Sequence, residues 1–149
     1  MNAFVAAGAG FLLAVLWFDL IFDVQVRGHD GEALPEPVLA SIATYYARVT
    51  TTSRPMNLLI AAVMLATVAA TVVEAARGDD PGWAAWLSVR LEAFAVGLAR
   101  VRTVPNAVCL GGRRDPADRQ SALARAVLGD HVACFAAILG LLVLQLAAF

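Results

Sequence analysis

Charged residues are scarce in this sequence of 149 residues. They make up 15% of the chain, whereas soluble domains hold about 25%. Hydrophobic residues account for 60%, and the mean hydropathy is +0.73. The formal net charge is −1, so there is no excess of basic residues with which to bind nucleic-acid phosphates. This composition predicts a single membrane-embedded domain and gives no support for a nucleic-acid-binding protein.

Cysteine and histidine are also rare, with two residues of each type. Cys109 and Cys134 lie far apart and belong to no CxxC or zinc pattern, so neither a disulfide framework nor a structural zinc site is expected. A bis-histidine haem is a poor match, and the metal-binding HExxH motif is absent. The N-terminus has no basic segment before its apolar run, so a retained span is expected there rather than a signal peptide.

Long hydrophobic segments dominate what the sequence does contain. Four of them are long enough to cross the roughly 30 Å hydrocarbon core of a bilayer as helices. The predicted spans are about 3–27, 54–77, 83–110 and 116–149. A shorter segment, about 37–50, has apolar residues at helical spacing but is too short to span, so an amphipathic helix is predicted. The expected fold class is all-α: an integral membrane four-helix transmembrane bundle with a short amphipathic helix between the first two spans.

Arginine is the only basic residue type apart from histidine, and its distribution predicts the orientation of the bundle. Nine arginines fall on the side that holds the two longer connections: Arg27, Arg48, Arg54, Arg100, Arg102, Arg113, Arg114, Arg119 and Arg125. Only Arg77 clearly falls on the other side. The positive-inside rule makes the arginine-rich side cytoplasmic. A multi-pass protein of the cell (inner) membrane is therefore expected, with both termini outside, in the periplasm.

Charged residues of several spans lie at about the same depth, near the cytoplasmic end. Asp19 and Asp23 share one helical face of the first span, and Asp130 and His131 are adjacent in the fourth. An ion in hydrocarbon costs at least ~2.5–3.5 kcal/mol, so such groups turn inward and find partners. These four residues are the candidate catalytic, proton-transferring groups. In the alternative interpretation, they form structural salt bridges with arginines and only fasten the bundle.

Two kinds of binding site are conceivable at this depth. Asp19, Asp23 and His131 offer oxygen and nitrogen ligands that suit a divalent metal ion; no other cofactor is indicated. Arginines near the same face suit an anionic headgroup. The candidate ligand-binding residues are Tyr45, Tyr46, Arg48, Arg100, Arg102, Asn106 and Arg125. At the opposite end, Glu74 and Arg90 are expected to pair.

Three functions remain open. The first is a membrane-embedded enzyme or binding protein with a polar pocket at the cytoplasmic end, acting on an amphiphilic or lipid-like small molecule. The second is a channel or transporter for an ion or small solute, which would need a homo-oligomer because four spans leave little room for a pore. The third is an accessory or assembly subunit of a membrane complex. A pocket beside Asp19 and His131 favours the first, a continuous polar line the second, and carboxylates all paired with arginines the third.

Overall fold

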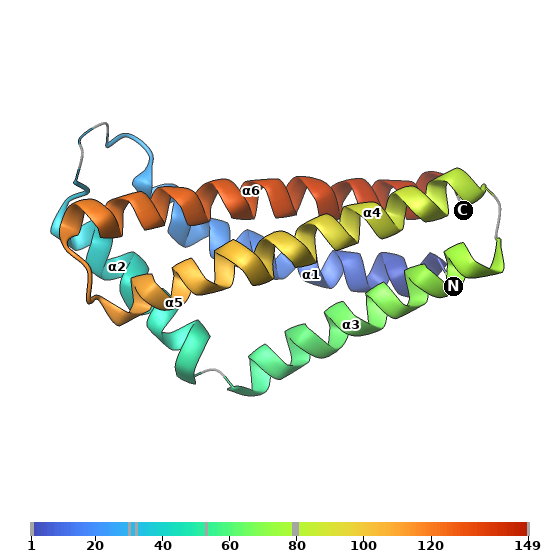
Figure 1. Ribbon diagram of the computed structural model, residues 1–149, viewed down its shortest axis with the longest axis horizontal. Coiled ribbons are helices and arrows are strands. Elements are labelled where there is room, and N and C mark those ends of the chain that lie inside the picture. The colour runs from blue at the N-terminus through green and yellow to red at the C-terminus, as the bar shows by residue number, and fades with distance from the viewer. Residues whose placement is uncertain (1, 30, 32, 53, 79–80, 149) are drawn as a thin grey trace.

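The computed structural model describes residues 2–29, 31, 33–52, 54–78 and 81–148, and every regular element in these ranges is a helix. Four helices are long and apolar enough to cross a membrane: Asn2–Val26, Pro55–Arg77, Gly82–Gly112 and Ala117–Ala147. The all-α class is confirmed, and so are four helices with the length and composition of membrane spans. Figure 1 shows both chain ends at one end of the bundle and the short helix α2 at the other.

The centre of the bundle is formed by α1 (Asn2–Asp23) and α6 (Ala117–Ala147), which run side by side in opposite directions (Figure 1). Both helices are apolar on most sides, so hydrophobicity alone does not select the face that is buried. Residue size does: Ala9 and Ala137 are buried in the shared core, whereas Trp17 and Phe18 are exposed. Small inward residues let the two backbones approach closely.

The third long helix contains a distortion near its charged residues. α4 (Gly82–Leu98) continues through one π-helical turn, η3 (Ala99–Thr103), into α5 (Val104–Gly112). Pro105 has no N–H with which to bond a carbonyl one turn earlier, and the wider turn lies directly before it. Arg102 belongs to this turn, so the local geometry of the π-turn sets where its side chain emerges.

The amphipathic segment forms α2 (Glu36–Ala47), followed by a second π-turn, η2 (Arg48–Thr52). α2 packs against α5 and α6 at the end of the bundle, with Leu39, Ile42 and Tyr46 buried. The contact with α5 is very close, because a Cβ atom added to Gly111 would lie 2.7 Å from the backbone nitrogen of Ala47. Glycine at 111 therefore fixes how near α2 lies to the bundle.

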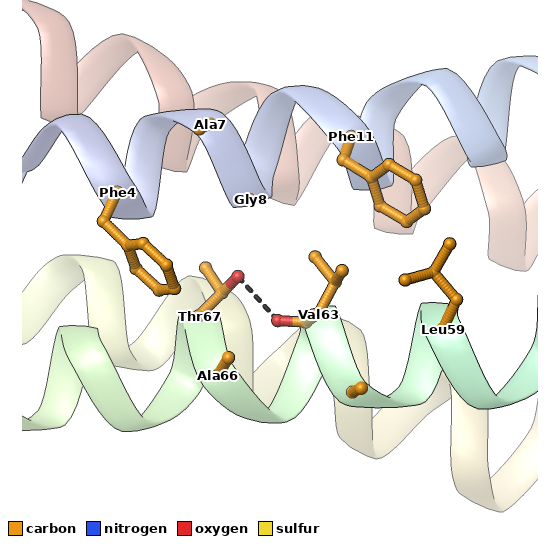
Figure 2. A pocket seen from close by; sticks show the side chains of 9 residues that line it. Phe4, Ala7, Gly8, Phe11, Leu59, Val63, Ala66 and Thr67 are labelled. Carbon is orange, nitrogen blue, oxygen red and sulfur yellow. Dashed lines mark hydrogen bonds between the residues drawn. The ribbon is translucent and has the colours of Figure 1, made fainter.

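The second long helix, α3 (Arg54–Arg77), packs against α1 and α4. An apolar crevice lies between α1 and α3, and Figure 2 shows Phe4 and Phe11 on one side of it and Leu59, Val63 and Thr67 on the other. The helices approach most closely where Gly8 faces Thr67: a Cβ atom at Gly8 would overlap the threonine side chain. The crevice is lined almost entirely by apolar atoms and holds no charged side chain.

Candidate functional site

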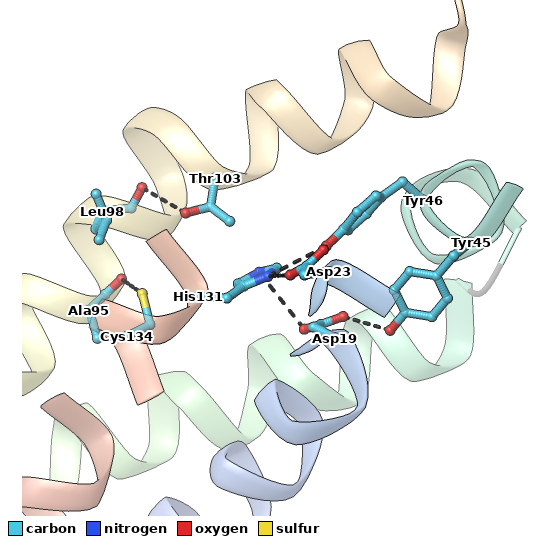
Figure 3. A network of polar contacts seen from close by, with 9 residues as sticks. All are labelled: Asp19, Asp23, Tyr45, Tyr46, Ala95, Leu98, Thr103, His131 and Cys134. Carbon is cyan, nitrogen blue, oxygen red and sulfur yellow. Dashed lines mark hydrogen bonds and ion pairs between the residues drawn. The ribbon is translucent and has the colours of Figure 1, made fainter. Parts of the chain in front are cut away.

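A buried network of polar side chains joins α1 to α6 at the end of the bundle near α2 (Figure 3). Asp19 and Asp23 lie one helical turn apart on α1 and both face His131 of α6. Nδ1 of His131 lies 2.6 Å from Asp23 Oδ2, a hydrogen bond between buried groups. Nε2 lies 3.9 Å from Asp19 Oδ2, which is too long for a direct hydrogen bond. The imidazole ring is thus hydrogen-bonded through Nδ1, whereas Nε2 has the more distant Asp19 carboxylate beside it.

Two adjacent tyrosines of α2 complete the network. Tyr45 donates a hydrogen bond of 2.6 Å to Asp19, and Tyr46 donates one of 2.5 Å to Asp23. Neighbouring residues on a helix point about 100° apart, so they reach separate partners, here two carboxylates one turn apart. The Tyr45 ring also stacks on Phe22 at a centroid distance of 4.0 Å. Each carboxylate therefore has its own phenol donor, and His131 lies between them.

The environment keeps both phenols protonated. Burial raises the pKa of Tyr45 well above its ordinary value of 10.0, and the hydrogen bond to Asp19 and that residue's negative charge raise it further. Burial likewise raises the pKa of Tyr46, followed by the charge of Asp23 and the hydrogen bond to it. A phenol beside a carboxylate in a dry site resists ionisation because two negative charges would then lie side by side. Both tyrosines act as hydrogen-bond donors throughout the physiological pH range.

A shallow groove adjoins this network on the outer side of α2. It is lined by Phe22, Pro37, Ala40, Ser41, Thr44, Tyr45 and Arg48. Arg48 is the one charged residue among them, and Tyr45 belongs both to the groove and to the network. The groove therefore offers an apolar wall, hydroxyl groups and a cation beside the phenol that contacts Asp19.

Asp130 has a different partner from its neighbour His131. Its carboxylate is buried and lies 3.1 Å from the guanidinium of Arg102, which is more than half exposed. The second carboxylate oxygen, Oδ2, has no hydrogen-bond partner among the described residues. Asp130 therefore extends the polar region toward η3.

The other predicted ligand-binding residues are dispersed. Arg125 donates hydrogen bonds to the backbone carbonyls of His29 (3.2 Å) and Gly31 (2.6 Å), and so holds the loop before α2. Arg100 is exposed on η3 and makes no hydrogen bond or ion pair within the described chain. Asn106 is partly buried on α5. Of the predicted set, the structure brings Tyr45 and Tyr46 into the network, Arg48 beside it, and Arg102 onto Asp130.

The proposed metal ligands are close together but engaged with other groups. Asp19, Asp23 and His131 are bonded to tyrosines and to one another rather than converging on a common point. No group of three or more His, Cys, Asp or Glu residues in the described ranges has an arrangement that could hold a metal ion. A divalent metal at these three residues stays a prediction.

A second polar cluster, not singled out from the sequence, lies near the end that carries the chain termini. It consists of Thr71 and Glu74 of α3, Ser88 and Glu92 of α4, and Gln145 of α6, all buried. Gln145 Nε2 lies 3.3 Å from Glu74 Oε2 and 3.4 Å from Ser88 Oγ. The expected pair of Glu74 with Arg90 was wrong: Glu74 points inward to Gln145, whereas Arg90 is exposed.

Helical spacing would have revealed the members of this second cluster on α3 and α4, though not Gln145. Thr67, Thr71 and Glu74 recur at i, i+4 and i+7 on α3, and Ser88 and Glu92 are one turn apart on α4. Each pattern places polar groups on one face of an otherwise apolar helix, which is the arrangement that a buried polar contact requires.

Comparison with known proteins adds no family: no protein-family model matches the chain, and no curated protein or solved structure is significantly similar to it.

Proposed function

We propose that the chain is a multi-pass membrane protein that performs acid–base chemistry on an amphiphilic, lipid-like molecule at the α2 end of the bundle. One observation carries the proposal: His131 is anchored through Nδ1 to Asp23, and Nε2 makes no hydrogen bond with the described residues. The bond at one ring nitrogen sets the tautomer and the ring orientation, and leaves the other nitrogen as the basic atom. An imidazole oriented in this way is suited to take and return a proton.

Tyr45 links this histidine to a place where a ligand can bind. Proton transfer between the groove and Nε2 would pass through the Tyr45 hydroxyl and the Asp19 carboxylate, which are 2.6 Å apart. The last step, between Asp19 Oδ2 and Nε2, spans 3.9 Å and requires these two side chains to move closer. In the groove, Arg48 suits an anionic head group, and Phe22 and Pro37 suit an apolar body. These features favour an amphiphile with a negative group, such as an acidic lipid.

The membrane orientation is part of the same proposal. The arginine-rich end, with α2, would face the cytoplasm, and both termini would face the periplasm. The position of both termini at one end of the bundle supports an even number of crossings (Figure 1). Reporter fusions at residue 148 and within the α2–α3 connection test it: an active periplasmic reporter at the α2–α3 connection would contradict the orientation.

The binding step is tested by extracting and weighing what co-purifies with the protein. An anionic amphiphile should accompany the wild type in detergent and fall at least several-fold in Arg48→Gln. Arg100→Gln is the matched control, because Arg100 is exposed and makes no hydrogen bond or ion pair with the described residues. Equal amounts of bound amphiphile in both variants would reject Arg48 as its binding group.

The chemical step is tested on the bound molecule. When the loaded protein is placed in D₂O, acid–base chemistry at the site should exchange acidic carbon-bound hydrogens of the ligand, which is seen as a mass increase. His131→Gln should stop the exchange but retain the ligand, since His131 does not line the groove. Unchanged exchange in that variant would exclude His131 as the base.

A second function, an oligomeric channel or transporter, is favoured by one observation. The Glu74–Gln145 contact places buried polar groups at the far end of the bundle as well. However, Ala137, Ile138 and Leu141 form an apolar layer on α6 between that end and His131. Ion or solute flux in proteoliposomes would support transport. The third function, an accessory subunit, is disfavoured because Asp19 and Asp23 bond to tyrosine and histidine rather than to arginine.

A further inference from the structure

The second polar cluster has unused acceptor atoms in a dry place. Glu92 is 3% exposed, and neither of its carboxylate oxygens has a hydrogen-bond partner in the described chain. Gln145 is 1% exposed, and its Oε1 atom is also without a partner. A buried carboxylate with no hydrogen-bond donor is among the least favourable groups that a protein can hold. These atoms therefore imply a bound partner that is not one of the protein's own side chains.

The side chains around Glu92 offer one shared donor at most: Thr71 is close enough to act on the Glu92 carboxylate, but it has a single hydroxyl proton. The Thr71 hydroxyl gives its proton to the backbone carbonyl of Thr67 at 2.9 Å. The Gln145 amide nitrogen is directed to Glu74 and Ser88. Glu74, whose carboxylate is close enough to act electrostatically on Glu92, adds further negative charge. The electrostatic potential at Glu92 is therefore negative, and no positive charge among the described side chains offsets it.

All three unpartnered atoms are oxygen acceptors, namely both carboxylate oxygens of Glu92 and Oε1 of Gln145. A ligand that satisfies acceptors and offers no lone pairs of its own is a cation. Carboxylate, amide and hydroxyl oxygens, with no nitrogen or sulfur ligand, select a hard cation. Glu74 keeps its negative charge but accepts a hydrogen bond from the Gln145 amide, whereas both oxygens of Glu92 lack a partner among the described residues. A single positive charge placed at Glu92 would balance that carboxylate.

We infer that Glu92, Gln145 and Glu74, with the hydroxyls of Ser88 and Thr71, form a binding site for a monovalent metal cation of the Na⁺ type. The site joins three helices, α3, α4 and α6. It is separate from the His131 network, because Cys134, Ala137 and Leu141 of the apolar core lie between them on α6. The inference does not depend on the chemistry proposed for His131.

Thermal unfolding of the detergent-purified protein tests the site. Choline chloride is replaced stepwise by NaCl at constant ionic strength, so that only a specific cation effect remains. A ligand that binds only the folded state raises the unfolding midpoint, by roughly 4 °C or more near saturation. Glu92→Gln should abolish the Na⁺ dependence, because the amide carries no charge and brings its own donor. Asp118→Asn, at an exposed acid on α6, should retain it.

A direct measurement keeps the inference testable if Glu92→Gln does not fold. Equilibrium binding of radioactive Na⁺ to the wild type should give one site per chain, with K⁺ and Li⁺ as competitors that define its size preference. Equal stability of the wild type in NaCl and choline chloride, with no bound radioactive Na⁺, would overturn the inference. An unfolding midpoint that depends on pH but not on Na⁺ would also overturn it, because a proton on the Glu92 carboxyl would then take the place of the cation.

Discussion

Asp23 and His131 are 108 residues apart in the sequence, yet Asp23 Oδ2 and Nδ1 of His131 are joined by a hydrogen bond of 2.6 Å between buried groups. α1 and α6 place these residues opposite each other, and Tyr46 donates a second hydrogen bond to the same carboxylate at 2.5 Å. Asp23 thereby receives two donors in a site that is closed to solvent. A carboxylate satisfied in this way orients the imidazole, which leaves Nε2 as the atom that faces Asp19.

The first prediction concerns the tautomer of His131. In the wild type, ¹⁵N NMR should show the proton on Nδ1, because that nitrogen donates to the Asp23 carboxylate. In Asp23→Asn the neutral amide no longer favours this tautomer, so the His131 signals should move toward those of free imidazole. His131→Gln assigns the signals, since the chain has two histidines. Identical ¹⁵N spectra in wild type and Asp23→Asn would mean that Asp23 does not orient the ring.

The helical fold could be predicted from the sequence because a long apolar run that is to cross a membrane has few alternatives to a helix. The proximity of Asp19 to Asp23 likewise follows from their spacing on one helix. The partners of each acid do not follow from spacing. Tyr45 and Tyr46 reach the two aspartates only because α2 lies close over α5, and this depends on the tertiary contact at Gly111.

Inward-facing polar groups without a nearby charge pattern were the hardest to predict. Gln145 lies in an apolar run, and nothing local marks it as a contact of Glu74. Arg90 and Glu74 suggested an ion pair by type and depth, but Arg90 is on the exposed side of α4. Which face of an apolar helix is buried is set by its neighbours, and hydrophobicity alone cannot supply that choice.

The second prediction concerns tyrosine ionisation. Both phenols have a folded-state pKa above the unfolded value of 10.0. The stability that they contribute is complete below pH 10 and decreases as pH rises above it, because the unfolded chain then loses the phenol protons first. The two tyrosines of the chain are Tyr45 and Tyr46, so tyrosinate absorbance reads the site directly. We expect no tyrosinate signal until the protein unfolds, as followed in parallel by circular dichroism.

The variants Tyr45→Phe and Tyr46→Phe assign that titration. Each should leave one phenol that still ionises only on unfolding. A phenol that titrates near pH 10 in the folded protein would contradict its burial beside an aspartate.

The third prediction concerns the ion pair of Arg102 with Asp130. Arg102→Gln leaves the buried Asp130 carboxylate without its positive partner. The loss should reach about 1–2 kcal/mol, less than the 3–5 kcal/mol typical of a fully buried pair, because Arg102 itself is mostly in contact with solvent. Arg100→Gln, two residues away in the same π-turn and exposed, should change stability by less than about 0.5 kcal/mol. Asp130→Asn should make Arg102→Gln nearly neutral; an undiminished loss in the double variant would show that the pair is not the cause.

The fourth prediction uses two neighbouring glycines to test how α2 is held. A Cβ atom at Gly111 would lie 2.7 Å from the Ala47 nitrogen and 3.0 Å from its Cα, and backbone atoms cannot move aside as a flexible side chain can. Gly111→Ala should therefore push α2 away, destabilise the protein by about 1–3 kcal/mol and weaken the Tyr45 and Tyr46 contacts. Gly112→Ala meets nothing within 4 Å and should be neutral or slightly stabilising.

Tyrosinate titration measures the displacement of α2. In Gly111→Ala the two phenols should ionise at lower pH than in the wild type, whereas in Gly112→Ala they should not. If both variants titrate like the wild type, the close approach at Gly111 is not what places the tyrosines on Asp19 and Asp23.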